Sequence, residues 1–172
     1  MTVSYEFDTR PEHGGLYDVA DGIRWLRMPL PMVLEHINLW LLDDADGCAI
    51  VDTGVNIDSN RDVWRKTLSG PAGDSAVTRV FVTHLHPDHA GCAGWLTCKH
   101  DVDLWMTREE YLLCRVLIAD TGRDAPDAGV QFYRAAGFPD DALHRYQEMF
   151  GMFGRYVSPL PESYRRLQDG NI

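Results

Sequence analysis

The sequence predicts an α/β (α+β) protein of one domain, with a mixed sheet rich in antiparallel strands followed by a helical block. Its 172 residues are the length of one domain that can bury its own core. Short apolar or alternating runs follow one another closely as far as residue 52, which is typical of consecutive strands. From residue 107 onward, helix-start signals alternate with glycine and proline breaks, which favours helices.

Four short runs are expected to form a meander of strands. They are LYDVA (16–20), IRWLRM (23–28), INLWLL (37–42) and CAIVD (48–52). The segment DDADG (43–47) places Asp and Gly between the last two runs, which predicts a hairpin turn. Further along, VTRVFVTH (77–84) is rich in β-branched residues and predicts a buried strand. LWM (104–106) predicts another short strand.

One helix is predicted between the meander and the buried strand. It covers DSNRDVWRKTLSG (58–70), where Asp58 or Ser59 can serve as N-cap and Gly70 can end the helix. A second helical segment, DHAGCAGWLTC (88–98), follows the buried strand. The order of strands, helix, strand and helix indicates an α/β core.

The block from residue 107 to 166 is predicted to be a helical insert or cap. Thr107 and Glu110 form a T-x-x-E capping box ahead of YLLCRVLIAD. Two more helical segments, DAGVQFYRAAG (127–137) and DDALHRYQEMFGMFGRY (140–156), follow. Their aromatic residues favour helix packing, with the wall of an apolar acyl or aromatic pocket as the alternative.

Composition and charge exclude several classes of protein. The formal net charge of −10 argues against nucleic acid as a partner, because phosphates need a basic face. No run of about 18 apolar residues occurs, so no membrane-spanning helix is expected. Residues 1–15 are polar and acidic, without the apolar core of a signal peptide. The four cysteines lie far apart, which indicates reduced thiols in the cytoplasm.

The segment THLHPDHAG gathers three of the seven histidines of the chain. His84 and His86 are two residues apart at the end of a predicted strand, so their imidazoles point to one face. Asp88 and His89 follow on the adjacent turn. Imidazole and carboxylate ligands suit Zn, Fe or Mn, and zinc accepts mixed sets readily. The spacing predicts one ion held by the first pair and a second by the other, roughly 3.5–4 Å away.

The segment IVDTG (50–54) supplies a second signal, because it ends a predicted strand in Asp52. Metal-bound imidazoles commonly donate their outer N–H to a carboxylate, which fixes the tautomer. We expect Asp52 to serve His84 in this way. On its own, an Asp–Gly pair after a strand is usually only a turn.

IVDTG followed some thirty residues later by THLHPDHAG resembles the metallo-β-lactamase superfamily, which includes glyoxalase II-type thioesterases and lactonases. The resemblance covers roughly residues 15–106, and the helical block resembles an insertion seen in some members. It implies half of an αβ/βα sandwich. It also implies a first metal site with His84 and His86, a second with Asp88 and His89, and Asp52 behind them as an outer carboxylate.

The chemistry implied by this resemblance is attack of a metal-bound hydroxide on the carbonyl of an ester, thioester, lactone or lactam. Two divalent ions are implied, zinc by preference and iron or manganese otherwise. A bound ion lowers the pKa of water toward about 7, and Asp88 is expected to orient the hydroxide or relay its proton. The expected partner is a small-molecule substrate, which these shared motifs do not select.

The downstream half of the sequence departs from the family pattern. Family members carry a third histidine for the first metal, a bridging aspartate and a last histidine for the second, all in the C-terminal half. The last histidine here is His144, and nothing after it resembles those motifs. The chain is therefore expected to match only an N-terminal half and to bind metal weakly. An alternative is a non-catalytic shortened relative that binds a partner or itself. Because half a sandwich exposes an apolar face and a sheet edge, a homo-oligomer is expected.

Overall fold

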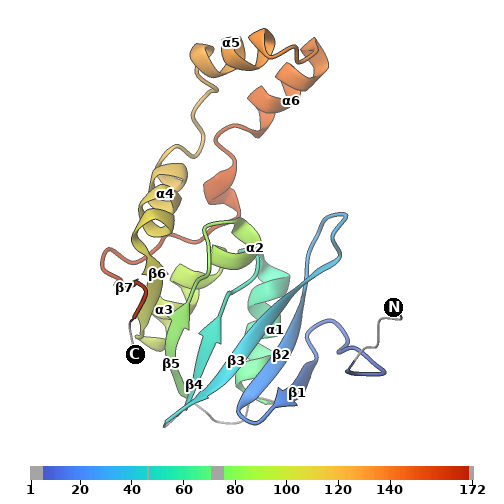
Figure 1. Cartoon of the computed structure of the whole chain (residues 1–172), viewed down its shortest axis with the longest axis vertical. Coiled ribbons are helices and arrows are strands. Elements are labelled where there is room, and N and C mark those ends of the chain that lie inside the picture. The colour runs from blue at the N-terminus through green and yellow to red at the C-terminus, as the bar shows by residue number, and fades with distance from the viewer. Residues whose placement is uncertain (1–5, 46, 71–75, 171–172) are drawn as a thin grey trace.

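A mixed sheet forms the centre of the molecule (Figure 1), as a computed structural model of residues 6–45, 47–70 and 76–170 shows. Within these residues the sheet has seven strands that lie side by side in chain order. They are β1 (Leu16–Ala20), β2 (Ile23–Pro29), β3 (His36–Asp44), β4 (Gly47–Val51), β5 (Ala76–Phe81), β6 (Asp103–Thr107) and β7 (Arg165–Leu167). Strands β1 to β4 pair antiparallel, and β4 to β7 pair parallel. The predicted mixed sheet with an antiparallel start is confirmed.

The helices divide into two groups. The described helices are α1 (Asp58–Leu68), α2 (Pro87–Ala90), α3 (Ala93–His100), α4 (Arg108–Ala119), α5 (Asp127–Ala135) and α6 (Asp140–Met149), with a short 3₁₀ turn η1 (Phe153–Arg155). Helices α1 and α3 lie on one face of the sheet, whereas α5 and α6 stand well away from it (Figure 1). None of the helices in the described ranges has the length and apolar character needed to cross a membrane.

The core lies between the sheet and helices α1 and α3. Alternate residues of the strands point to this side, as the period of a strand requires, and Leu26, Met28 and Leu39 are fully buried there. Burying each such side chain contributes roughly 1.5–3 kcal/mol. Trp64 of α1 is also fully buried, and its indole N–H donates to the carbonyl oxygen of Thr53 at 2.7 Å. This bond ties the helix layer to the turn that follows β4.

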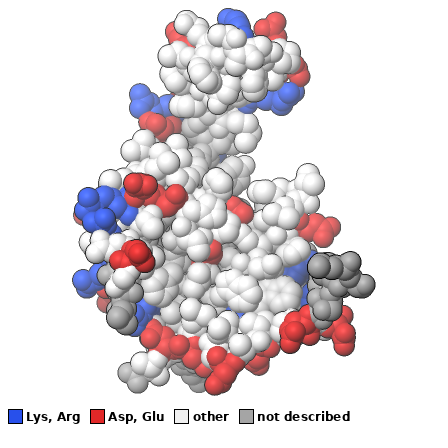
Figure 2. Space-filling view, viewed as in Figure 1, with Lys and Arg blue, Asp and Glu red and all other residues white. Residues whose placement is uncertain are grey.

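The opposite face of the sheet carries a row of large apolar side chains. Trp25 pairs with Trp40, Trp40 with Val51, Val51 with Phe81, and Phe81 with Trp105. All five are partly buried. Seen from the side of Figure 1, few charged side chains lie over the sheet, and acidic ones gather along its lower rim (Figure 2). We call these five residues the aromatic row.

Several element boundaries differ from those predicted. The N-cap of α1 is Ile57, without a side-chain cap bond, so the prediction of a cap by Asp58 or Ser59 is wrong. Asp58 instead lies in the first turn, where a negative charge favours the helix dipole. In the predicted hairpin turn between β3 and β4, residue 46 lies outside the described residues, and Asp44 pairs with Gly47 beside it.

Two differences bear on the second half of the chain. The predicted helical segment 88–98 is two helices, because α2 ends at Ala90 and α3 begins at Ala93. The block 107–166 contains the predicted helices, but Arg165–Leu167 forms strand β7 and extends the sheet beside β6. A strand of three residues is too short to show an alternating pattern in the sequence, so this strand could not be predicted.

Candidate metal centre

The predicted ligand residues gather at one edge of the sheet. Strands β4, β5 and β6 are parallel, so their carboxyl ends meet at this edge, where α/β proteins commonly bind ligands. Asp52 directly follows β4, and the histidine motif follows β5. Strand β2 runs in the same direction, because two antiparallel pairings separate it from β4. The hairpin tip after β2 therefore stands at the same edge (Figure 1), and its Met32, Val33 and Leu34 are exposed.

Asp52 forms the hub of the polar network at this edge. Its carboxylate accepts hydrogen bonds from the backbone N–H of Thr83 at 2.8 Å and from the Thr83 hydroxyl at 2.8 Å. It also contacts Nδ1 of His89 at 2.8 Å. Asp52 is 5% exposed and has φ of +60°, a strained backbone for a residue with a side chain, which typically costs about 1–3 kcal/mol. The three contacts offset this strain and hold the turn.

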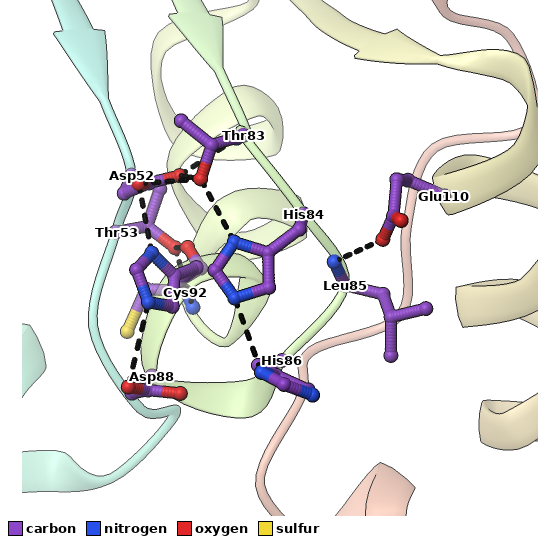
Figure 3. Close-up of polar contacts among 10 residues, drawn as sticks. Asp52, Thr53, Thr83, His84, Leu85, His86, Asp88, Cys92 and Glu110 are labelled. Carbon is purple, nitrogen blue, oxygen red and sulfur yellow. Dashed lines mark hydrogen bonds and ion pairs between the residues drawn. The ribbon is translucent and has the colours of Figure 1, made fainter.

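His84 and His86 form the first donor pair. Nδ1 of His84 lies 3.0 Å from the hydroxyl of Thr83, which leaves Nε2 turned toward His86. The distance from this Nε2 to Nδ1 of His86 is 3.1 Å (Figure 3). The prediction placed both residues at a strand end, but β5 stops at Phe81, so the convergence comes from a bend. The backbone N–H and the hydroxyl of Thr83 both donate to Asp52 and hold this bend.

Asp88 and His89 form the second donor pair, on helix α2. Because Nδ1 of His89 faces Asp52, its Nε2 faces the opposite way and lies 3.5 Å from Oδ2 of Asp88. The rings of His84 and His89 have centroids only 3.9 Å apart. The two pairs therefore adjoin, as the sequence predicts.

The donor set fits a divalent cation in part. Zinc binds imidazole nitrogen at about 2.0–2.1 Å, so two donors at a tetrahedral angle lie about 3.3 Å apart. The N···N distance of 3.1 Å in the first pair and the N···O distance of 3.5 Å in the second are close to that spacing. Across the described ranges, no three His, Cys, Asp or Glu side chains are grouped to hold one ion together. Each pair thus offers two donors.

The electrostatics of the two pairs differ. Burial lowers the pKa of His84, and the neighbouring imidazoles of His89 and His86 lower it further. Burial also lowers the pKa of His89, but the hydrogen bond to Asp52 and the charges of Asp52 and Asp88 outweigh it and raise that pKa overall. Because metals bind neutral imidazole, the lowered pKa of His84 favours cation binding, whereas the raised pKa of His89 opposes it.

Asp52 lies in the predicted place but contacts a different imidazole. We expected it to hold His84, whereas it contacts His89 directly and reaches His84 only through the hydroxyl of Thr83. The reason is the bend after β5, which places Thr83 between the carboxylate and the first histidine. Asp52 therefore links both donor pairs.

Three residues of the site were not predicted from the sequence. Thr53 donates from its hydroxyl to the carbonyl of His89 at 2.7 Å, and Thr83 joins Asp52 to His84. Glu110 accepts from the backbone N–H of Leu85 at 2.6 Å. The predicted capping box is wrong, because Thr107 is the N-cap of α4 but makes no side-chain cap bond. Thr53 and Thr83 lie within the segments IVDTG and THLHPDHAG, and this position is the only signal that could have indicated them.

Comparison with known proteins places this chain in a family. A family model described as the metallo-beta-lactamase superfamily matches residues 33–163. A beta-lactamase domain protein from Burkholderia ambifaria is 38% identical, with a TM-score of 0.78 over 95% of this chain and 47% of its own. A metallo-beta-lactamase family protein from Thermus thermophilus is 25% identical, with a TM-score of 0.65 over 90% of this chain and 48% of its own.

A curated relative from Aspergillus novofumigatus, named as an atrochrysone carboxyl ACP thioesterase, is 36% identical over 63 residues. That match covers 37% of this chain and 19% of the relative. The chain thus spans about half the length of the two solved relatives and less of the curated one. Because the family match takes in both the Asp52 turn and the histidine motif, and the fold is shared along almost the whole chain, the protein belongs to the metallo-β-lactamase superfamily.

Proposed function

We propose that this protein is a metal-dependent hydrolase, in which water attacks the carbonyl carbon of an ester, thioester, lactone or lactam and the acyl C–O, C–S or C–N bond breaks. The observation that carries this proposal is the convergence of the pairs His84/His86 and Asp88/His89 at the carboxyl edge of the sheet. A bound divalent cation, zinc by preference and iron or manganese otherwise, would polarise the carbonyl and lower the pKa of water at the site toward about 7.

The residues of the chain take separate roles in this proposal. His84 and His86 would hold one cation, and Asp88 and His89 a second. The carboxylate of Asp88 would also accept a proton from the attacking water, because a positioned carboxylate can act as a general base. Asp52 keeps Nε2 of His89 turned toward the site by binding the other ring nitrogen.

An apolar hairpin tip supports a substrate with an acyl or aromatic part. Met32, Val33 and Leu34 are 55%, 102% and 59% exposed, and they stand at the same sheet edge as the ligand pairs. Apolar groups left in water at such a position can cover an apolar substrate. Together with the thioesterase name of the curated relative, this favours a small-molecule thioester as the first substrate to test.

We expect zinc to bind this chain weakly, or at fewer than two ions per chain, because each pair offers two donors where a catalytic zinc usually has three. Isothermal titration calorimetry measures affinity and stoichiometry. His86→Ala should abolish the residual binding at the first pair. His144→Ala should bind as the wild type does, because His144 lies exposed on α6 beside Glu148. Two tightly bound zinc ions per chain would contradict the expectation.

Hydrolysis of a thioester, lactone and cephalosporin panel by the zinc-supplemented protein tests the reaction itself. Asp88→Asn should lower the rate about 10²–10⁴-fold, the usual contribution of a general acid or base. Cleavage at equal rates by wild type and variant would show that Asp88 does not act as the base.

We also propose that the protein is a homo-oligomer in which a second copy covers the aromatic row. Trp40 lies within this row, between Trp25 and Val51, and such a contiguous apolar face typically marks an interface. We expect light scattering to show a dimer or larger species, and Trp40→Glu to shift it toward the monomer. Phe132→Glu places the same charge on exposed α5 and should leave the size unchanged. A wild-type monomer at high concentration would refute this proposal.

The cysteines support a reducing compartment, and we propose the cytoplasm. Cys48, Cys92, Cys98 and Cys114 are all free thiols. Burial raises the pKa of Cys92 and of Cys114 to about 12, so these thiols are unreactive at neutral pH. Their role is to fill the core as small apolar side chains.

A further inference from the structure

We propose that Glu110 is a positioning residue of the metal centre, which holds the turn between His84 and His86 through the backbone N–H of Leu85. This inference rests on the proposed metal-dependent function. Glu110 would not touch the cation or the substrate. It would fix the backbone from which the two imidazoles of the first donor pair extend.

The contact joins two parts of the chain that lie 25 residues apart in sequence. Oε2 of Glu110, in the first turn of α4, accepts from the N–H of Leu85 at 2.6 Å (Figure 3). Hydrogen bonds to an ionised carboxylate are shorter and roughly twice as strong as neutral ones. The side chain of Leu85 packs against the core. Both its backbone and its side chain are therefore held in place.

The N–H of Leu85 needs a partner from outside the sheet. Strand β5 ends at Phe81, so the backbone of the bend that follows has left the ladder of strand pairs. A backbone N–H that is left unpaired away from water costs free energy comparable to a lost hydrogen bond. Glu110 satisfies this donor at the residue that separates the two ligands.

Glu110 is not engaged in the role that its sequence position suggests. In a capping box it would turn back toward the N–H of Thr107, but the structure directs its carboxylate to Leu85. Glu109, one residue earlier in the same helical turn, is exposed. Both acids lie in the first turn of α4, where a negative charge favours the helix dipole. Glu109 therefore offers a matched control for charge and for helix stability.

Loss of the bond between Glu110 and Leu85 would alter the distance between the two nitrogens of the first donor pair. Nε2 of His84 and Nδ1 of His86 are 3.1 Å apart, and the residue between them is anchored by Glu110. A small movement of that turn would separate the two nitrogens or rotate one ring. Outer partners of this kind typically contribute 10–100-fold to metal affinity.

Titration with cobalt(II), followed by its visible absorption, tests the inference. Glu110→Ala should weaken cobalt binding about 10–100-fold and change the absorption band, because the ligand geometry alters. Glu110→Gln should bind within about threefold of the wild type, because its amide oxygen can accept the same hydrogen bond. Glu109→Ala should match the wild type in affinity and spectrum. Wild-type binding and spectrum in Glu110→Ala, or a Glu110→Gln variant as weak as Glu110→Ala, would overturn the inference.

A second measurement needs no metal. In the metal-free protein, the amide of Leu85 should exchange with solvent at least about tenfold faster in Glu110→Ala than in the wild type and in Glu109→Ala, since a hydrogen bond to a charged acceptor is among the stronger ones that a backbone amide makes. Circular dichroism checks that each variant is folded. Failure of the wild type to bind cobalt would count against the proposed function alone, whereas unchanged exchange of Leu85 would overturn the role of Glu110.

Discussion

Replacing Asp52 by alanine is expected to disconnect both donor pairs and to lower the free energy of unfolding by about 3–5 kcal/mol. The carboxylate is 5% exposed and accepts from the backbone and hydroxyl of Thr83 while contacting His89. Its removal leaves Thr83 and the partly buried His89 without this partner and places alanine at φ of +60°, which alanine tolerates poorly. Urea denaturation measures the loss.

The more conservative Asp52→Asn removes the charge but keeps a residue that tolerates this backbone. It is therefore expected to be less destabilising than Asp52→Ala and to act mainly on His89. Asp58→Asn is the matched control, because the Asp58 side chain is 97% exposed and should change stability little. An Asp52→Ala variant as stable as Asp58→Asn would contradict the role of Asp52 as the hub.

Asp52→Asn is also expected to change how the stability of the metal-free protein depends on pH. The hydrogen bond to Asp52 and the charges of Asp52 and Asp88 together outweigh burial and raise the pKa of His89. Protonated His89 therefore stabilises the fold, fully at pH below the unfolded value of 6.5, and this contribution is lost as the pH rises through the folded pKa. Asp52→Asn should lower the pKa of His89 in an NMR titration and flatten this part of the stability profile. An unchanged titration of His89 would be incompatible with this account.

The fold class and the convergence of the histidine motif could be predicted from the sequence because both rest on local patterns. Alternating runs predict strands from period alone, and strands β1 to β6 lie within a few residues of the predicted ones. The motif of His84, His86, Asp88 and His89 is compact, so its side chains could hardly lie far apart. The structure brings them together at the edge where parallel strands end.

The supporting contacts could not be predicted, because they depend on how distant segments meet. Asp52 contacts His89 and not His84 because β5 ends early and the chain bends at Thr83. Glu110 fits a local capping pattern equally well, and only its distance to Leu85 in the folded chain decides between the two roles. Local hydrogen-bonding motifs compete with tertiary contacts of this kind, and the sequence carries no signal for the outcome.

Gly91, in the motif THLHPDHAG, is the second position where a substitution is expected to lower stability strongly. The reason is steric. A Cβ at this position would lie 2.4 Å from the carbonyl oxygens of Gly54 and Pro87 and 2.6 Å from the backbone N of Asn56. All three are backbone atoms, which cannot turn aside as a flexible side chain can. Its φ of −53° is ordinary, so glycine is needed here for space and not for conformation. The close approach packs the turn after β4 against the end of α2, which carries His89.

Gly91→Ala is therefore expected to destabilise the fold by about 3 kcal/mol or more, at or beyond the upper end of usual overpacking costs. Gly122→Ala is the informative comparison, because nothing lies within 4 Å of its Cβ position but its φ is +83°. That variant should suffer only backbone strain, about 1–2 kcal/mol. Urea denaturation of both variants gives the order. If Gly91→Ala were more stable than Gly122→Ala, the close contact between the backbones of Gly54 and Gly91 would not be what holds His89 beside Asp52.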